Sequence, residues 1–148
     1  MALRGAGRMT ADDDLLIRDV RVLDADFWKP HTPVIHIGDD ADVFHGVLRF
    51  NESGPEQVDV IVPKYVWMDE VLAHATDVLY DSQQIRVATA CDIVLLKLFA
   101  AGLRDRTDIQ LMLSVSGAKL VHEVDERIAQ LDEEAQALWT EIKISFHA

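Results

Sequence analysis

The sequence predicts an α+β domain in which strands come first and helices last. Residues 10–88 hold short runs with strand-like alternation, broken by prolines, glycines and turn residues. From residue 89 to residue 146 the apolar side chains recur at helical spacing. Runs of strands followed by runs of helices are typical of α+β folds. With 148 residues, the chain has the length of one domain with one core, so residues 1–148 are expected to form a single unit.

Turn signals divide the strand-like half into segments. Residues 27–33 contain two prolines and are expected as a loop, and residues 51–55 are expected as a hairpin loop. Residues 65–76 have helical spacing. The expected strands are residues 14–22, 34–37, 43–50 and 57–62, followed by a second hairpin made of residues 78–80 and 85–88.

The helical half opens with an apolar helix over residues 90–101, which Gly102 can end. A second helix is expected over residues 107–114, with Asp105 or Arg106 as its cap. Two amphipathic helices, residues 120–131 and 134–144, follow and are joined by a tight turn.

Composition excludes several classes of protein. The net charge of −12 argues against broad, nonspecific nucleic-acid binding, which needs a cationic surface. No run approaches the roughly 18 apolar residues of a membrane helix, and the first residues lack the apolar core of a signal peptide. The single cysteine, Cys91, excludes an internal disulfide and a cysteine-based zinc site. A cytoplasmic location without a membrane partner is therefore the default expectation.

Three acids stand in or beside strand-like segments. Asp12 and Asp14 are two residues apart and precede an apolar run, so in a strand they would point to one face. Asp59 interrupts the β-branched run at residues 58–62, where a charge is costly to bury unless it is paired or metal-bound. Three carboxylates on neighbouring strands suit metal-dependent phosphoryl or nucleotidyl transfer. Alternatively, the segment from Thr10 to Asp14 is a capped helix start or a solvated turn.

Two stretches resemble the nucleotidyltransferase superfamily. The run Arg-Met-Thr-Ala-Asp-Asp-Asp-Leu-Leu-Ile at residues 8–17 is similar to the family's Arg-x-Thr-x-Asp-hydrophobic-Asp strand. The closest branch is that of the minimal, toxin-like members related to the abortive-infection AbiEii proteins. Residues 92–100 and 105–109 resemble the family's lysine helix and its Asp-x-x-Asp helix start. The resemblance spans roughly residues 4–114 and implies a nucleotidyltransferase-like mixed sheet with C-terminal helices.

The resemblance also implies a metal site. Asp12 and Asp14 would ligate Mg²⁺ or Mn²⁺, and Asp59 would complete the site and act as general base on the attacking hydroxyl. Such hard oxygen ligands suit these ions better than zinc.

The resemblance implies that Arg8, Thr10 and Lys97 bind the nucleotide. Asp105 and Asp108 would contact Lys97 and not the nucleotide itself. The residues alone leave other roles open. Lys97 lies in an apolar helix. It could equally be a structural residue at the edge of the core, with its carbon chain buried and its ammonium group in water. Asp105 and Asp108 fit an acidic capping box, with one acid at the N-cap and the other at N3. That role is compatible with pairing to Lys97.

The chain departs from the family at its start. In the family, a helix ending in Gly-Gly or Gly-Ser precedes the Asp-x-Asp strand, and its amides cradle the triphosphate. Gly5 and Gly7 are too close to Asp12 to take that place, and Asp13 replaces an apolar residue. Two expectations compete: the start is assigned too late, or the chain is a degenerate member that has lost triphosphate binding.

The leading functional expectation is Mg²⁺-dependent transfer of a nucleotidyl group from an NTP to a hydroxyl on RNA, protein or a small molecule. An antitoxin protein is the partner that the toxin-like branch implies. The alternative, from another class, is a non-catalytic domain that acts through protein contacts. The acceptor has no signature in the sequence, because acceptor specificity resides in loops and helices without a recognisable pattern.

Overall fold

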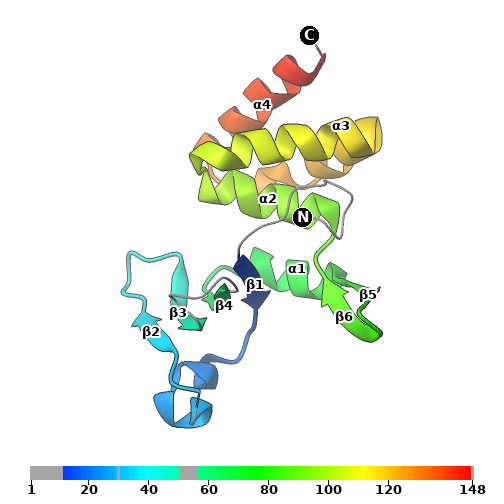
Figure 1. Ribbon diagram of the computed structural model, residues 1–148. Helices are drawn as coiled ribbons and strands as arrows, with labels where there is room; N and C mark the ends of the chain where they lie inside the picture. The colour runs from blue at the N-terminus through cyan, green and yellow to red at the C-terminus, as the bar shows by residue number, and fades with distance from the viewer. Residues whose placement is uncertain (1–11, 30, 51–56, 148) are drawn as a thin grey trace. The chain divides into compact units, whose positions relative to one another are not determined.

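The computed structural model describes residues 12–147, apart from residue 30 and residues 51–56 (Figure 1). This part of the chain is α+β, as the sequence predicts, with strands first and helices last. It divides into two compact units, one ending at Ala73 and the other beginning at His74. The expectation of a single domain stays a prediction.

The N-terminal unit is built on a mixed four-stranded sheet in the order β1-β4-β3-β2 (Figure 1). Strand β1 pairs parallel with β4, whereas β4 pairs antiparallel with β3 and β3 antiparallel with β2. The positions of β2, β3 and β4 agree closely with the strands expected over residues 34–37, 43–50 and 57–62. The strands are β1 (Asp12–Leu16), β2 (Val34–Ile37), β3 (Phe44–Phe50) and β4 (Gln57–Pro63).

One face of this sheet is covered by apolar side chains. Leu48 on β3 and Val60 on β4 are register partners, and both are buried against Val22. Trp28 packs on the same cluster, and its ring Nε1 donates to the carbonyl oxygen of Val22 at 2.5 Å. Since side chains alternate along a strand, the residues next to Leu48 and Val60 point to the opposite face. That opposite face carries the charged residues Arg49 and Asp59.

The segment after β1 differs from the expected strand over residues 14–22. It forms two short 3₁₀ helices, η2 (Val20–Leu23) and η3 (Ala25–Trp28), so the loop expected next begins with a helical turn. The carboxylates of Asp19 and Asp24 accept hydrogen bonds from the backbone N–H groups of Arg21 and Asp26, at 3.0 and 2.9 Å. Such local side-chain-to-backbone bonds compete with strand pairing and start a helical turn instead.

Helix α1 (Trp67–His74) follows β4 and confirms the short helix expected there. It buries Met68 and Val71. Arg18, which follows β1, donates to the carbonyl oxygen of Asp69 at 2.7 Å and pairs with its carboxylate at 2.8 Å. This contact ties the segment after β1 to the first turn of α1.

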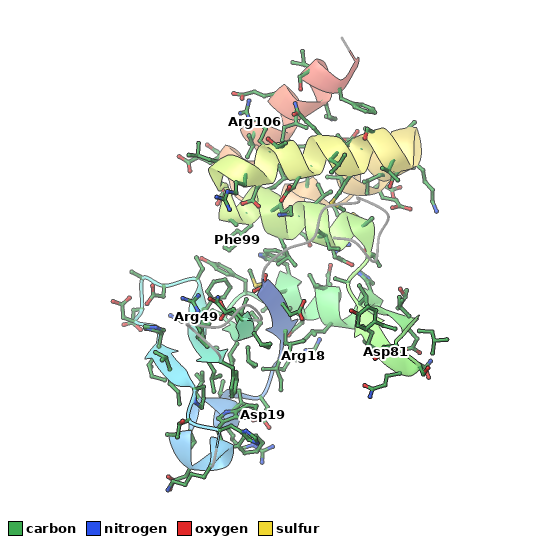
Figure 2. The ribbon with its side chains drawn as sticks, in the orientation of Figure 1. Arg18, Asp19, Arg49, Asp81, Phe99 and Arg106 are labelled. Carbon is green, nitrogen blue, oxygen red and sulfur yellow. The ribbon has the colours of Figure 1, made fainter. Side chains whose placement is uncertain are left out.

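The C-terminal unit begins with the expected second hairpin, β5 (Thr76–Tyr80) and β6 (Gln83–Val87). Asp81 and Ser82 form its turn, both with positive φ, at 45° and 65°. Figure 2 labels Asp81 at the tip of this hairpin. The helices that follow are α2 (Ala90–Ala100), α3 (Leu103–Asp125), the 3₁₀ helix η4 (Ile128–Gln130) and α4 (Glu133–His147).

Helix α3 covers the positions of two helices that the sequence predicts over residues 107–114 and 120–131. It runs from Leu103 to Asp125, so the first segment begins earlier and the second ends earlier than expected. Its path is interrupted at Gly117, where φ is 64° and ψ is −154°. The N-cap residue is Gly102, and not Asp105 or Arg106.

The three long helices pack on one another through an apolar interior. Trp139 of α4 is almost fully buried, and its ring Nε1 donates to the carboxylate of Asp125 at 2.7 Å. Arg106 of α3, labelled in Figure 2, pairs with Glu141 of α4 at 2.6 Å. In the part of the chain that the structure describes, no helix combines the length and the apolar character needed to cross a membrane.

Candidate functional site

The charged face of the N-terminal sheet carries one row of side chains across three strands. Asp14 on β1 is the register partner of Asp59 on β4, and Asp59 is the register partner of Arg49 on β3. Neighbouring strands lie about 4.8 Å apart, and register partners point to the same face. Two of the three acids expected at the metal site are therefore adjacent and share a face. We call Asp14, Asp59 and Arg49 the charged row.

Asp59 is held by Arg49 through both carboxylate oxygens. Arg49 Nε donates to Oδ1 at 2.9 Å, and Nη2 donates to Oδ2 at 2.7 Å. The side-chain amide of Gln57 lies 3.3 Å from each oxygen. Asp59 is buried, so this two-pronged pairing supplies the counter-charge that a buried carboxylate needs. Arg49 is labelled beside β3 and β4 in Figure 2.

The pairing also sets the protonation state of Asp59. The hydrogen bonds from Arg49 hold the pKa of Asp59 below its usual value, although burial acts in the opposite direction. Three clustered carboxylates without a metal ion predict a raised pKa for at least one of them. Asp59 is not that member, because the hydrogen bonds from the Arg49 guanidinium outweigh the effect of burial on its pKa. For the cluster as a whole the expectation stays a prediction.

The other expected members of the metal site are only partly described. The backbone of Asp12 is the register partner of Gln57, but its side chain lies outside the described residues, as do Arg8 and Thr10 entirely. Among the residues that the structure describes, no group of three His, Cys, Asp or Glu side chains is arranged to hold a metal ion. The metal site stays a prediction that rests on the placement of Asp14 and Asp59.

The donor atoms present fit a hard divalent cation in kind. Asp14 and Asp59 offer carboxylate oxygens from adjacent positions, which is what Mg²⁺ and Mn²⁺ prefer. A carboxylate has about four lone-pair positions, and Arg49 and Gln57 already contact both oxygens of Asp59. An ion bridging the two acids would therefore compete with these N–H donors for Asp59.

The C-terminal unit contains the second expected cluster. Lys97 of α2 donates to Asp105 and to Asp108 of α3, each at 2.8 Å. The side chains of Lys97 and Asp108 are 19% and 3% exposed. Burial tends to lower the pKa of Lys97, but the hydrogen bonds to the two acids outweigh it and the pKa is raised. Lys97 is thus a charged, paired side chain between two helices.

The capping role expected for the two acids is only partly right. Asp105 stands at N3 of α3, where its carboxylate accepts from the N–H of Gly102 at 2.9 Å. Asp108 takes no part in the cap and is a buried partner of Lys97. Whether Lys97 also contacts a nucleotide stays a prediction.

A further buried ion pair was missed from the sequence. Asp92 in the first turn of α2 is fully buried and pairs with Arg127, which follows α3, at 2.6 Å. The hydroxyl of Thr89 donates to the other oxygen of Asp92 at 2.5 Å, and His74 lies 3.5 Å from the first. The signal was present in Thr-Ala-Cys-Asp at residues 89–92, which is a helix start with an acid at N3.

Comparison with models of known protein families finds no match, and comparison with curated proteins finds none either. The charged row and the motifs in the sequence are therefore the features that bear on function.

Proposed function

We propose that this chain is a Mg²⁺-dependent nucleotidyltransferase of the minimal, toxin-like kind, which moves a nucleotidyl group from an NTP to an acceptor hydroxyl. The observation that supports the proposal is the register pairing of Asp14 with Asp59 on one face of the sheet. Chemically similar ligands from two strands meet there, next to the position of Asp12. The acceptor class is a hydroxyl on RNA, protein or a small molecule, and an antitoxin protein in the cytoplasm is the proposed partner.

In this proposal the residues of the chain act as ligands and as a base. Asp12, Asp14 and Asp59 hold the metal, which when bound neutralises phosphate charge during the displacement. Asp59 also accepts the proton of the attacking hydroxyl. Its lowered pKa makes it a weak base while Arg49 holds it, so the base function requires the pair with Arg49 to loosen.

The test is transfer of label from each of the four α-³²P NTPs, with Mg²⁺ or Mn²⁺, to total RNA and to a protein extract. Asp14→Asn should lower transfer by at least about 100-fold, since mutations that remove catalytic electrostatics have effects of this size. The matched control is Asp13→Asn, which removes the same charge one residue away, on the opposite face of the strand. Its activity should stay within about threefold of wild type. Equal losses in the two variants would contradict the proposed site.

The second candidate function is a non-catalytic domain that acts through protein contacts. The pairing of both Asp59 oxygens with Arg49 favours it, because this arrangement stabilises the acid without a metal. On this alternative the wild-type chain transfers no label from any of the four NTPs and binds no Mn²⁺. Detectable, Asp14-dependent transfer would exclude it.

A further inference from the structure

The two ends of the Arg49–Asp59 pair differ in their access to solvent. The Arg49 side chain is 34% exposed, whereas that of Asp59 is 10% exposed. Arg49 can therefore turn its guanidinium toward water by rotating its long side chain, but Asp59 stays in place on its strand. If the pair opens, the arginine is the partner that moves.

Asp59 also lies between a cation and an anion in the charged row. Arg49 is its neighbour on one side and Asp14 is its neighbour on the other. With no divalent ion present, Arg49 supplies the positive charge that makes burial of Asp59 tolerable. A divalent ion between Asp14 and Asp59 would supply that charge itself and would repel the guanidinium at close range.

We propose, on the basis of the proposed function, that Arg49 supplies the positive charge next to Asp59 while no metal is bound. Binding of a divalent ion then releases Arg49 from Asp59, and the free guanidinium binds the triphosphate. The released guanidinium remains anchored on β3, one strand away from Asp59. Its planar fork of N–H donors matches phosphate oxygens in the same two-pronged way as it matches a carboxylate. Metal binding would thus create a phosphate-binding group beside the site.

The first experiment measures Mn²⁺ binding by electron paramagnetic resonance of the free ion. Arg49→Gln should bind Mn²⁺ at least about fivefold more tightly than wild type, because a competing charge within a few ångströms is removed. The matched control is Arg21→Gln, which removes an arginine paired with Asp19 on the surface. That change should leave Mn²⁺ affinity within about twofold, because a distant exposed charge is screened by salt.

The second experiment measures binding of inorganic triphosphate by calorimetry in the presence of saturating Mg²⁺. Arg49→Gln should weaken triphosphate binding by about tenfold, the loss of one charge-assisted contact, while Arg21→Gln should not. If Arg49 had only a structural role, Arg49→Gln would weaken the binding of Mn²⁺ and of triphosphate together. Opposite changes for the metal and for triphosphate are the signature of the release.

Nuclear magnetic resonance of the wild-type chain provides a readout that needs no stable variant. The Nε–H signal of Arg49, assigned by its absence in Arg49→Lys, should shift on addition of Mg²⁺, and that of Arg21 should not. An unshifted Arg49 signal at saturating Mg²⁺ would overturn the inference even if Arg49→Gln does not fold.

The outcomes separate this inference from the proposed function. If wild type binds Mn²⁺ and Arg49→Gln binds it no more tightly, the metal site stands and the inference is overturned. If only Arg49→Gln binds Mn²⁺, the release is overturned, because Arg49 then excludes the ion from the wild-type chain instead of being displaced by it. If neither binds, the proposed function fails and the inference fails with it. Tighter Mn²⁺ binding with unchanged triphosphate affinity overturns the phosphate-binding step.

Discussion

Lys97 and Asp108 form an ion pair between helices α2 and α3, with Nζ 2.8 Å from Oδ2. The Asp108 side chain is 3% exposed, and Lys97 provides a cationic partner for its carboxylate. Asp105 contacts the same ammonium group. Removing one partner of such a pair leaves an uncompensated buried charge, which costs more than the pair itself contributes.

Lys97→Met is therefore expected to lower the free energy of unfolding by about 3 kcal/mol. Lys119→Met is the matched control, because Lys119 is 86% exposed and pairs with Glu123 on the surface of α3. An exposed pair of this kind contributes about 0.5 kcal/mol or less. Urea denaturation followed by circular dichroism measures both. Similar losses in the two variants would show that Asp108 is not stabilised by Lys97.

Asp59→Asn is expected to destabilise the chain in a pH-dependent way. The hydrogen bonds from Arg49 lower the pKa of Asp59 in the folded state. The stability that this carboxylate contributes is thus fully present above the pKa that Asp59 has in the unfolded chain. It is lost as the pH falls through the lower pKa that Asp59 has in the folded state. At pH 7 the variant should be about 2 kcal/mol less stable than wild type.

That difference should shrink as the pH falls below about 4, near the ordinary pKa of an aspartate. Urea titrations at pH 7, 5, 4 and 3 measure it, with Asp13→Asn as the control. Asp13 is exposed, so its replacement should give a small difference at every pH. A difference for Asp59→Asn that stays constant down to pH 3 would contradict the role of the Arg49 pair.

Cys91 should react slowly with thiol reagents in the native protein. The thiol is 4% exposed, and burial raises its pKa to about 11. The reactive thiolate should therefore be about 200-fold scarcer at pH 8 than in an exposed cysteine, whose pKa is about 8.5. Colour release from Ellman's reagent, with and without 6 M guanidinium, measures this ratio. Fast reaction of the folded protein would show that α2 opens readily at its first turn.

Gly117→Ala is expected to lower the free energy of unfolding by about 2 kcal/mol. Gly117 combines a φ of 64° with a ψ of −154°, a conformation that only glycine adopts without strain. A Cβ at this position would meet no atom within 4 Å, so the loss would come from the backbone alone. Ser116→Ala, an exposed neighbour, should have a small effect. Increased stability of Gly117→Ala would mean that α3 becomes continuous without cost.

Sequence reasoning located the main strands but could not assign the partner of Asp59. A hairpin loop over residues 51–55 makes residues 50 and 56 the closing pair and places Arg49 opposite Gln57. In the structure, Phe50 pairs with Val58 and Arg49 with Asp59. Turn length sets register, and a change of two residues in the pairing leaves each side chain on its face but gives it a new partner.

The strand expected over residues 14–22 was wrong for a different reason. Alternation continued through residues 14–22, but Asp19 and Asp24 each capture a backbone N–H group two residues later. These local hydrogen bonds form in place of strand pairing because they close a small loop, so that few residues have to be ordered. The spacing of apolar residues does not show whether local hydrogen bonds or strand pairing will form.

The sequence alone determined the α+β class, the order of strands and helices, and the alternation that can place carboxylates on one face of a strand. These properties follow from hydrophobic periodicity, which is written in neighbouring residues. Only the tertiary structure decided which charges meet. Arg49 with Asp59, Lys97 with Asp105 and Asp108, and Arg127 with Asp92 come together through strand register and helix packing. A buried charge takes whichever counter-charge the fold brings within about 3 Å, and that distance depends on the whole core.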